Sequence, residues 1–118
     1  MARDIRVKRV YDAAEDADGV RVLVDRIWPR GMAKEKLRAK WLKEAAPSTE
    51  LRKRFHHDAA KWEDFKKAYF AELDAVPEAV ERLLAMGEGQ RLTLLYAAQD
   101  TEHNNARALM EYLTERSR

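Results

Sequence analysis

GVRVLVDRIWPRG, at residues 19–31, is the stretch that decides the fold, because a buried strand ends there in a group of polar side chains. Its first half, residues 20–24, is almost continuously apolar, which is typical of a strand buried on both faces of a parallel sheet. Pro29 ends the strand, since proline cannot donate to a sheet ladder and restricts the residue before it. The polar and aromatic residues at this ending are Asp25, Arg26, Trp28 and Arg30. We therefore expect a functional site where the strand leaves the core.

Two further stretches have strand character, IRVKRVY at 5–11 and RLTLLYA at 91–97. The loop between the first two strands has about eight residues, which is shorter than a parallel crossover needs. These strands are therefore either a wide antiparallel pair, or parallel and not adjacent. The last strand leads at once into a helix, which is half of a βαβ unit. The pattern predicts a small single-domain α/β fold, Rossmann-like and three-layered, with a short, mostly parallel sheet flanked by helices.

Helical spacing of apolar residues accounts for most of the remaining chain. A basic helix is predicted over residues 33–43, with its buried side formed by Leu37, Trp41 and Leu42. A short helix is expected to start at Ser48, a good N-cap residue, and to run to Phe55. A longer amphipathic helix follows over residues 62–76, and Pro77 separates it from a helix that stops near Met86.

Composition limits the classes of protein to which the chain can belong. Its 118 residues suit one domain, 1–118, and with 46% hydrophobic residues the chain is apolar enough to fold alone. Zero cysteines exclude a disulfide framework, thiolate metal sites and a cysteine nucleophile. The N-terminal residues are highly charged, and no segment approaches the length of about eighteen apolar residues that a membrane span needs. We expect a cytoplasmic protein with no membrane partner.

Charge is unevenly distributed along the chain. The formal net charge is +2, but residues 21–43 hold eight basic residues against Asp25 and Glu35, a local balance of +6, so the remainder sums to −4. Such a basic segment can attract phosphates. It can equally be a solvated helix face. The sequence leaves both interpretations open.

The ends of two strands are expected to form one crevice. Ligands of open α/β sheets collect outside the carboxyl ends of the strands, where helix N-termini present free amides. If the second and third strands are parallel neighbours, residues 25–30 and 96–105 share this crevice.

His103 shares the inward face of the last helix with Ala106 and lies in its first turn, where neutral imidazole is favoured. Asp25 and His103 are the candidate proton-transfer groups, with one alternative for each. Asp25 would instead brace the turn by pairing with an arginine, and His103 would pack and cap the helix.

Ligand binding is the role expected of six further residues: Arg26, Trp28, Arg30, Tyr96, Asn104 and His57. The two arginines are anion clamps, and Trp28 stands where a base or sugar could stack. Asn104 either donates to a ligand or satisfies the helix end. No metal site is assigned, because a metal would require the fold to gather Asp25, His57 and His103. The sequence lacks a phosphate loop, a GxGxxG turn, a GxSxG elbow, an HExxH motif and an EF-hand loop.

Linked motifs over nearly the whole chain resemble the YeaO-like family, a branch of the bacterial domain of unknown function 488. They are KRVYD at 8–12, DGVRVLVDRIWPRG at 18–31, Trp41, APSTELRKRF at 46–55, HD at 57–58 and LLYAAQDTEHNNA at 94–106. The resemblance implies a Rossmann-like α/β fold with its site at the VDRIWPRG and TEHNNA segments, and it implies no settled activity.

Two departures from the family pattern bear on the site. Broader relatives carry a Cys-His-Arg triplet near the start of the last helix, where this chain has Glu102, His103 and Asn104. Thiol chemistry proposed for those relatives therefore lacks its cysteine here. A small residue is more usual in the family at the position of His56, which implies a peripheral place for that side chain.

The sequence favours a protein whose crevice binds a small anionic ligand bearing a phosphate or carboxylate. If it is an enzyme, hydrolysis or transfer on a nucleotide-like substrate is the reaction class to test first. The alternative is a non-catalytic nucleic-acid-binding or regulatory module that uses the basic segment 21–43. A third hypothesis is an interaction subunit with an exposed apolar patch around Trp41. Catalysis itself, any cofactor and the oligomeric state stay unassigned.

Overall fold

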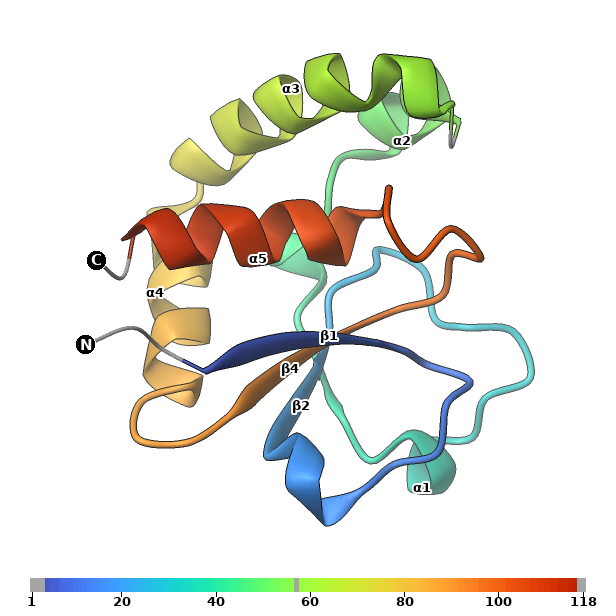
Figure 1. The fold of residues 1–118 in the computed structure, drawn as a ribbon, viewed down its shortest axis with the longest axis vertical. Coiled ribbons are helices and arrows are strands. Elements are labelled where there is room, and N and C mark those ends of the chain that lie inside the picture. Colours follow the sequence, from blue (N-terminus) through green and yellow to red (C-terminus); the bar gives the residue numbers. More distant parts are fainter. Residues whose placement is uncertain (1–3, 57, 117–118) are drawn as a thin grey trace.

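A computed structural model describes residues 4–56 and 58–116, and its centre is a four-stranded parallel sheet (Figure 1). The strands are β1 (Ile5–Arg9), β2 (Val20–Leu23), β3 (Lys40–Trp41) and β4 (Leu92–Tyr96), in the order β1-β4-β2-β3. All three strand pairs are parallel. The parallel sheet predicted from the apolar runs is confirmed.

Strand β4 lies between β1 and β2. It pairs with β1 from Ile5↔Leu92 to Arg9↔Tyr96, and with β2 from Val20↔Leu92 to Leu23↔Leu95. The prediction that the second and third long strands are parallel neighbours is therefore confirmed. Of the two arrangements left open for the first strand, the parallel, non-adjacent one is observed. The short loop between β1 and β2 thus joins strands that do not pair with each other.

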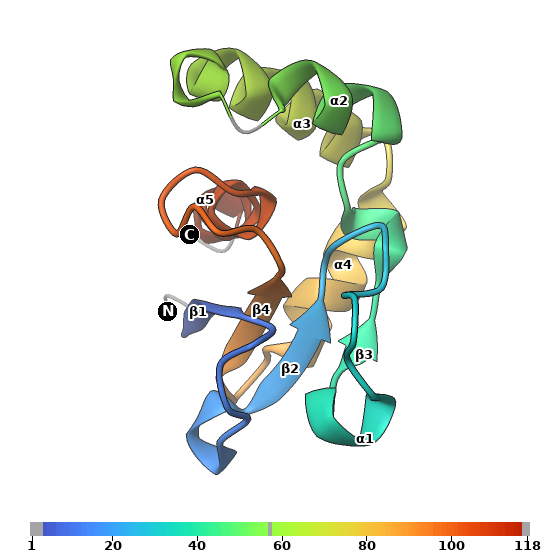
Figure 2. The same ribbon diagram turned by 90° about the vertical axis from the view of Figure 1, so that its right-hand side faces the viewer.

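Helices flank the sheet on both faces in a three-layer α/β arrangement, with α1 on the face opposite the main helical layer. They are α1 (Lys34–Leu37), α2 (Thr49–Phe55), α3 (Trp62–Asp74), α4 (Pro77–Met86) and α5 (Asn105–Arg116). Helix α5 lies against β1 and β4, and α3 packs on the far side of α5 together with α2 (Figures 1 and 2). Pro77 occupies the first turn of α4, where its missing N–H costs nothing. No helix in the described part of the chain is long and apolar enough to cross a membrane.

Side chains of β4 alternate between two cores. Leu92, Leu94 and Tyr96 face the helices and join the main cluster of buried residues. Leu95 faces the other way and packs in a smaller cluster with Val10, Leu23 and Leu37. Every residue of β4 is buried, as expected for a central strand covered on both faces.

An ion-pair network covers part of the second sheet face. The buried Arg21 pairs through Nη1 with Asp18, and its Nε and Nη2 donate to the Leu37 carbonyl at 3.0 and 2.9 Å. Lys8 Nζ lies 3.0 Å from the other Asp18 carboxylate oxygen, and Thr93 Oγ1 donates to the Asp18 carbonyl at 2.6 Å. Burial alone would raise the pKa of Asp18, but hydrogen bonds from the Glu15 backbone N–H, Lys8 and Arg21, together with the charge of Lys8, outweigh burial and lower it. Arg21 is therefore a structural residue and contributes nothing to a basic surface.

The prediction of a single helix over residues 33–43 is wrong. The helix stops at Leu37 because Arg38 adopts a left-handed conformation with φ 52°, and residues 40–41 form the edge strand β3. Leu37 and Leu42 are buried as expected, but Trp41 is 37% exposed. The edge of β2 decides the outcome, since Leu42 N donates to the Leu23 carbonyl at 3.0 Å. Local helical spacing is overridden because the backbone groups of a buried strand need partners.

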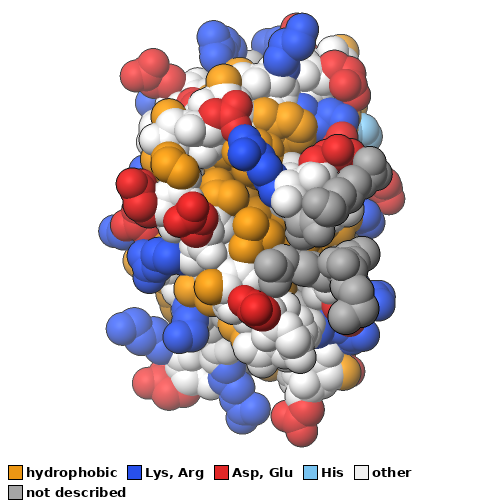
Figure 3. All heavy atoms as spheres, turned by 90° about the vertical axis from the view of Figure 1, so that its left-hand side faces the viewer, with side chains coloured by type: hydrophobic (Ala, Val, Ile, Leu, Met, Phe, Trp, Pro, Cys, Tyr) orange, Lys and Arg blue, Asp and Glu red, His pale blue; other side chains and the backbone are white. Residues whose placement is uncertain are grey.

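Charges of both signs share the face at which β1 begins and α5 ends. Figure 3 shows a strip of apolar side chains there, bordered by Lys, Arg, Asp and Glu. Such interspersed charges produce little net field over this face.

Candidate functional site

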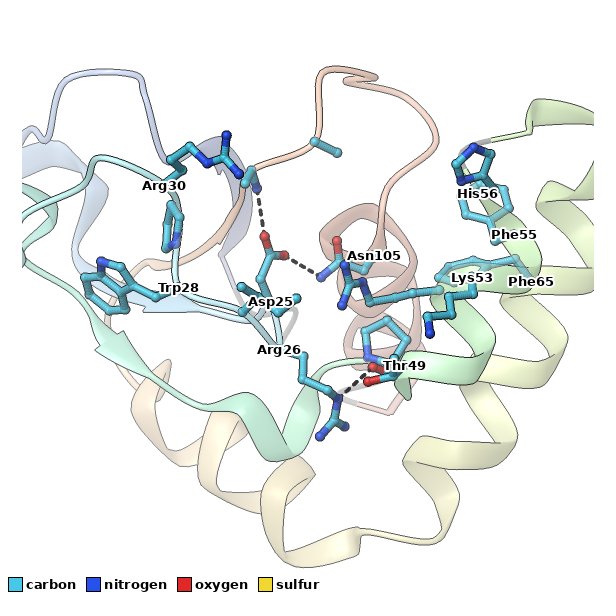
Figure 4. Close-up of a pocket in the computed structure, with 16 residues that line it drawn as sticks. Asp25, Arg26, Trp28, Arg30, Thr49, Lys53, Phe55, His56, Phe65 and Asn105 are labelled. Atoms are coloured by element: carbon cyan, nitrogen blue, oxygen red, sulfur yellow. Dashed lines mark hydrogen bonds between the residues drawn. The ribbon is translucent and has the colours of Figure 1, made fainter.

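A cavity of about 600 Å³ lies where β2 and β4 end (Figure 4). Four segments form its walls: the turn after β2, α2 with Pro47 before it and His56 after it, Phe65 of α3, and the residues after β4 up to the start of α5. We call it the crevice. Its lining residues are Asp25, Arg26, Ile27, Trp28, Pro29, Arg30, Pro47, Thr49, Arg52, Lys53, Phe55, His56, Phe65, Ala97, Ala98 and Asn105. The structure thus brings residues 25–30 together with Ala97, Ala98 and Asn105, which is part of the predicted segment 96–105.

Asp25 ties the end of β2 to the end of β4. Its Oδ2 accepts a hydrogen bond from Ala97 N at 3.0 Å, and its Oδ1 accepts one from Asn105 Nδ2 at 3.0 Å. Asn105 also donates to the Val24 carbonyl at 2.9 Å. Both carboxylate oxygens are thus used to hold the strand ends and α5 together. Bracing was one of the two roles predicted for Asp25, and these contacts with an amide and a backbone N–H correspond to it.

Arg26 is directed at backbone carbonyls. Its Nε donates to the Pro47 carbonyl at 3.1 Å, and its Nη2 donates to the Ala46 carbonyl at 3.2 Å. The side chain therefore links the turn after β2 to the segment that leads into α2 (Figure 4). This bonding fixes two walls of the crevice relative to each other. It is a different use of the guanidinium from the predicted anion clamp.

Helix α3 fixes the same segment from the other side. Glu72 accepts hydrogen bonds from Ser48 N at 2.8 Å and from Ser48 Oγ at 2.7 Å. Ser48 Oγ in turn accepts from Leu51 N at 3.1 Å, which confirms the predicted N-cap of α2. Tyr69 Oη donates to the Ala45 carbonyl, and burial raises the pKa of this tyrosine well above its usual value. The position of α2, and of the side chains it carries into the crevice, is thus tightly specified.

Besides Arg26, three cationic side chains line the crevice. Arg30 comes from the turn after β2, and Arg52 and Lys53 come from α2; all three are exposed. Within residues 4–56 and 58–116, none of their charged groups lies within ion-pair distance of a carboxylate. Figure 4 shows Arg30 and Lys53 on opposite sides of the cavity, with Asp25 and Asn105 between them. The crevice is therefore electropositive from two sides.

Apolar side chains make up much of the remaining wall. The rings of Phe55 and Phe65 are stacked with centroids 4.4 Å apart, and Trp62 packs against both at 5.9 and 5.7 Å. Ile27, directly after the buried strand, is 61% exposed and adds apolar surface to the same cavity. The crevice thus combines cationic and apolar walls, as small-molecule sites commonly do.

His103 lies outside the crevice, and no contact between it and Asp25 is observed among the described residues. It precedes α5, which begins at Asn105, so the expectation that it sits in the first helical turn is wrong. Asp100 Oδ1 accepts the His103 backbone N–H at 3.0 Å, and Oδ2 lies 3.1 Å from the ring Nδ1. Hydrogen bonds from the backbone of His103 and Glu102 lower the pKa of Asp100. The ring meets Trp62 edge-on at 5.3 Å. These contacts correspond to the packing role predicted as the alternative.

Structural contacts occupy three of the other predicted ligand residues. Asn104 is fully buried; its Nδ2 donates to the Asp100 carbonyl and its Oδ1 accepts from Arg107 N, each at 2.9 Å, so it satisfies the end of α5. Tyr96 is buried in the main core, and this burial raises its pKa. Trp28 Nε1 donates to the Met32 carbonyl at 2.6 Å, and its ring packs in the smaller core. His57 lies outside the described residues.

Arg52 and Lys53 are the functional candidates that sequence reasoning missed. They belong to APSTELRKRF, where the only local signal was a helix start, and charged residues on a short helix are typical of solvation. His56, interpreted as peripheral, lines the crevice from the left-handed position that ends α2, with φ 43°. Groups of three or more His, Asp or Glu side chains that could hold a metal are absent from the described residues.

Comparison with known proteins identifies relatives over the whole described chain. A family model described as the inactive DUF488-N3 subclade matches residues 4–118. An Escherichia coli (strain K12) relative, "Uncharacterized protein YeaO", is 47% identical over 111 residues, or 93% of this chain and 96% of the relative. Uncharacterized proteins of Mycobacterium bovis and Mycobacterium tuberculosis are each 47% identical over 70 residues, or 58% of this chain and 59% of each relative. No solved structure matches the chain significantly.

Proposed function

The chain belongs to the YeaO-like DUF488 family, and from that premise we propose that it binds a small organic anion in the crevice and leaves it chemically unchanged. The observation that carries the proposal is the set of three cations, Arg30, Arg52 and Lys53, which face one cavity from two elements without carboxylate partners in the described chain. Guanidinium groups suit planar carboxylate and phosphate oxygens, which they bind in pairs of hydrogen bonds. The cytoplasmic location expected from the sequence remains part of this proposal.

Charge balance within the crevice favours an anion. Asp25 is the only carboxylate among the described residues that line it, and its two oxygens accept hydrogen bonds from Ala97 N and Asn105 Nδ2. These donors partly offset its negative charge. An anion bound between the walls would therefore meet three mobile cationic groups and one carboxylate already committed to N–H donors.

Support for binding without catalysis comes from the two residues predicted to transfer protons. Asp25 braces the strand ends, and His103 is engaged by Asp100 and Trp62 away from the crevice. Acid–base catalysis by this pair would require both groups within hydrogen-bond reach of one substrate. The description of the matching family model as inactive points the same way.

Isothermal titration of the purified protein with pyrophosphate, citrate and AMP tests the proposal. We expect at least one probe to bind, and Arg30→Gln or Arg52→Gln to weaken its binding about tenfold or more, since a hydrogen bond to a charged group contributes roughly 1.5–3 kcal/mol. Arg54→Gln is the matched control, because Arg54 is an exposed arginine of the same helix that does not line the crevice. Equal affinity in all variants, or binding of none of the probes, would overturn the proposal.

Nucleic-acid binding by residues 21–43 remains the alternative prediction. Fewer basic side chains of this segment are exposed than the sequence suggested. Arg21 is buried, and Arg26 donates to the carbonyls before α2. Six exposed cations of the segment remain: Arg30, Lys34, Lys36, Arg38, Lys40 and Lys43. Affinity for DNA or RNA that falls steeply with salt and is weakened by Lys36→Gln would favour this alternative.

A further inference from the structure

The size of the crevice suits a ligand with an organic part. Its volume of about 600 Å³ lies within the range of roughly 300–1,000 Å³ typical of sites for small organic molecules. An inorganic phosphate or sulfate held by Arg52 and Lys53 would leave most of this space to water. The uncharged part of the ligand therefore fills the remainder, and its chemistry is set by the walls that carry no charge.

Those uncharged walls offer little to a hydroxyl-rich molecule. A sugar ring needs several side-chain amides or carboxylates to replace the water on its hydroxyl groups. In the described lining, the amide of Asn105 donates to Val24 and Asp25, and the Asp25 oxygens accept from Ala97 and Asn105. Thr49 adds one hydroxyl. A bound sugar would thus lose hydration at most of its hydroxyl groups without equivalent replacement.

Apolar atoms, in contrast, are abundant along the same walls. Ile27 is 61% exposed and stands with Pro29 on the turn after β2. Across the cavity, Figure 4 shows Phe55 and Phe65, whose stacked rings lie 28° from coplanar. A planar ring that covered Ile27 would remove this side chain from water and lie within a cavity whose far wall is aromatic.

Building on the proposed function, we infer that the ligand is an aromatic phosphate: a phosphate monoester whose organic part carries a planar aromatic ring, the class to which mononucleotides belong. The phosphate lies against Arg52 and Lys53 of α2, which suit its charge of about −1.5 to −2 at neutral pH. The ring lies between Ile27 and the wall formed by Phe55 and Phe65. The cationic groups select for the phosphate, and the apolar walls select for the ring.

Titration calorimetry with four phosphates tests the inference: phenyl phosphate, AMP, ribose 5-phosphate and inorganic phosphate. All four share the anionic group, so differences in affinity report on the organic part. We expect phenyl phosphate and AMP to bind at least tenfold more tightly than ribose 5-phosphate. Ile27→Ser is expected to reduce this advantage severalfold and to leave the affinity for ribose 5-phosphate unchanged. Ile27→Val, which keeps a branched apolar side chain, is expected to retain most of the advantage.

The outcomes separate this inference from the proposed function. Equal affinity for phenyl phosphate and ribose 5-phosphate, with both weakened by Arg52→Gln, would overturn the aromatic phosphate and leave anion binding intact. The absence of binding by all four phosphates, together with pyrophosphate and citrate, would overturn both. The aromatic phosphates could also bind more tightly than ribose 5-phosphate to the same extent in Ile27→Ser as in the native protein. That result would contradict the placement of the ring beside Ile27.

Discussion

Replacing Asp25 with asparagine separates its bracing role from a chemical one. In the native protein the two carboxylate oxygens accept from Ala97 N and Asn105 Nδ2, both at 3.0 Å. Asparagine offers one acceptor oxygen and one NH₂ group, so one of these donors would face another donor. Asn105 cannot compensate by turning its amide, because Nδ2 also donates to the Val24 carbonyl at 2.9 Å.

The expected destabilisation follows from this mismatch. An unpaired donor and the loss of a hydrogen bond to a charged group each cost roughly 1–3 kcal/mol, and Asp25 is only half-buried. We therefore expect Asp25→Asn to lower the free energy of unfolding by about 2 kcal/mol. For a chain of 118 residues, this corresponds to a fall in Tm of about 8 °C.

Thermal and urea unfolding followed by circular dichroism measure this effect. Asp12→Asn is the control, since it removes the same charge from an exposed loop position and should change stability by less than about 0.5 kcal/mol. Binding of AMP to the Asp25→Asn variant should be preserved or strengthened, because the variant loses the negative charge of the crevice. An unchanged Tm, or an abolished affinity in a fully folded variant, would refute the bracing role.

Three further outcomes follow from other contacts. Arg21→Met should lower the free energy of unfolding by about 3 kcal/mol in urea titrations, because it leaves the buried Asp18 without one of its partners; a change below 1 kcal/mol would contradict the network. Ser48→Ala should cost about 1 kcal/mol by the same measurement, since α2 loses its N-cap and Glu72 loses a donor. The lowered pKa values of Asp18 and Asp100 contribute stability that is complete above pH 4–5, the usual range of a carboxyl group, and is lost as pH falls below it. Asp100→Asn should therefore flatten the acid limb of a Tm-against-pH profile, and an unchanged limb would contradict this linkage.

Sequence patterns were most informative for elements that meet the central sheet. The apolar runs of β2 and β4 carry enough burial signal to identify both strands and their parallel pairing. Residues 33–43 show where this approach fails. Their helical spacing is real, but β3 forms because the edge of β2 needs backbone partners, and that need depends on contacts distant along the chain.

The sequence predicted where the candidate site lies better than it predicted which residues form it. Strand order was sufficient to bring residues 25–30 and 97–105 together, since parallel strands end at one edge. The approach of α2 depends on Arg26, Tyr69 and Glu72, which hold the segment before it. Spacing along the chain contains no trace of these contacts. Arg52 and Lys53 therefore became candidates only once the structure placed α2 across the crevice.

Nuclear magnetic resonance mapping of AMP on the ¹⁵N-labelled protein tests the central claim most directly. The account predicts saturable amide shifts in three segments, residues 25–30, 49–56 and 97–105, and their loss in the Arg52→Gln variant. Shifts confined to residues 34–43, or the absence of any saturable shift at millimolar AMP, would contradict the claim that this crevice is a binding site for an organic anion.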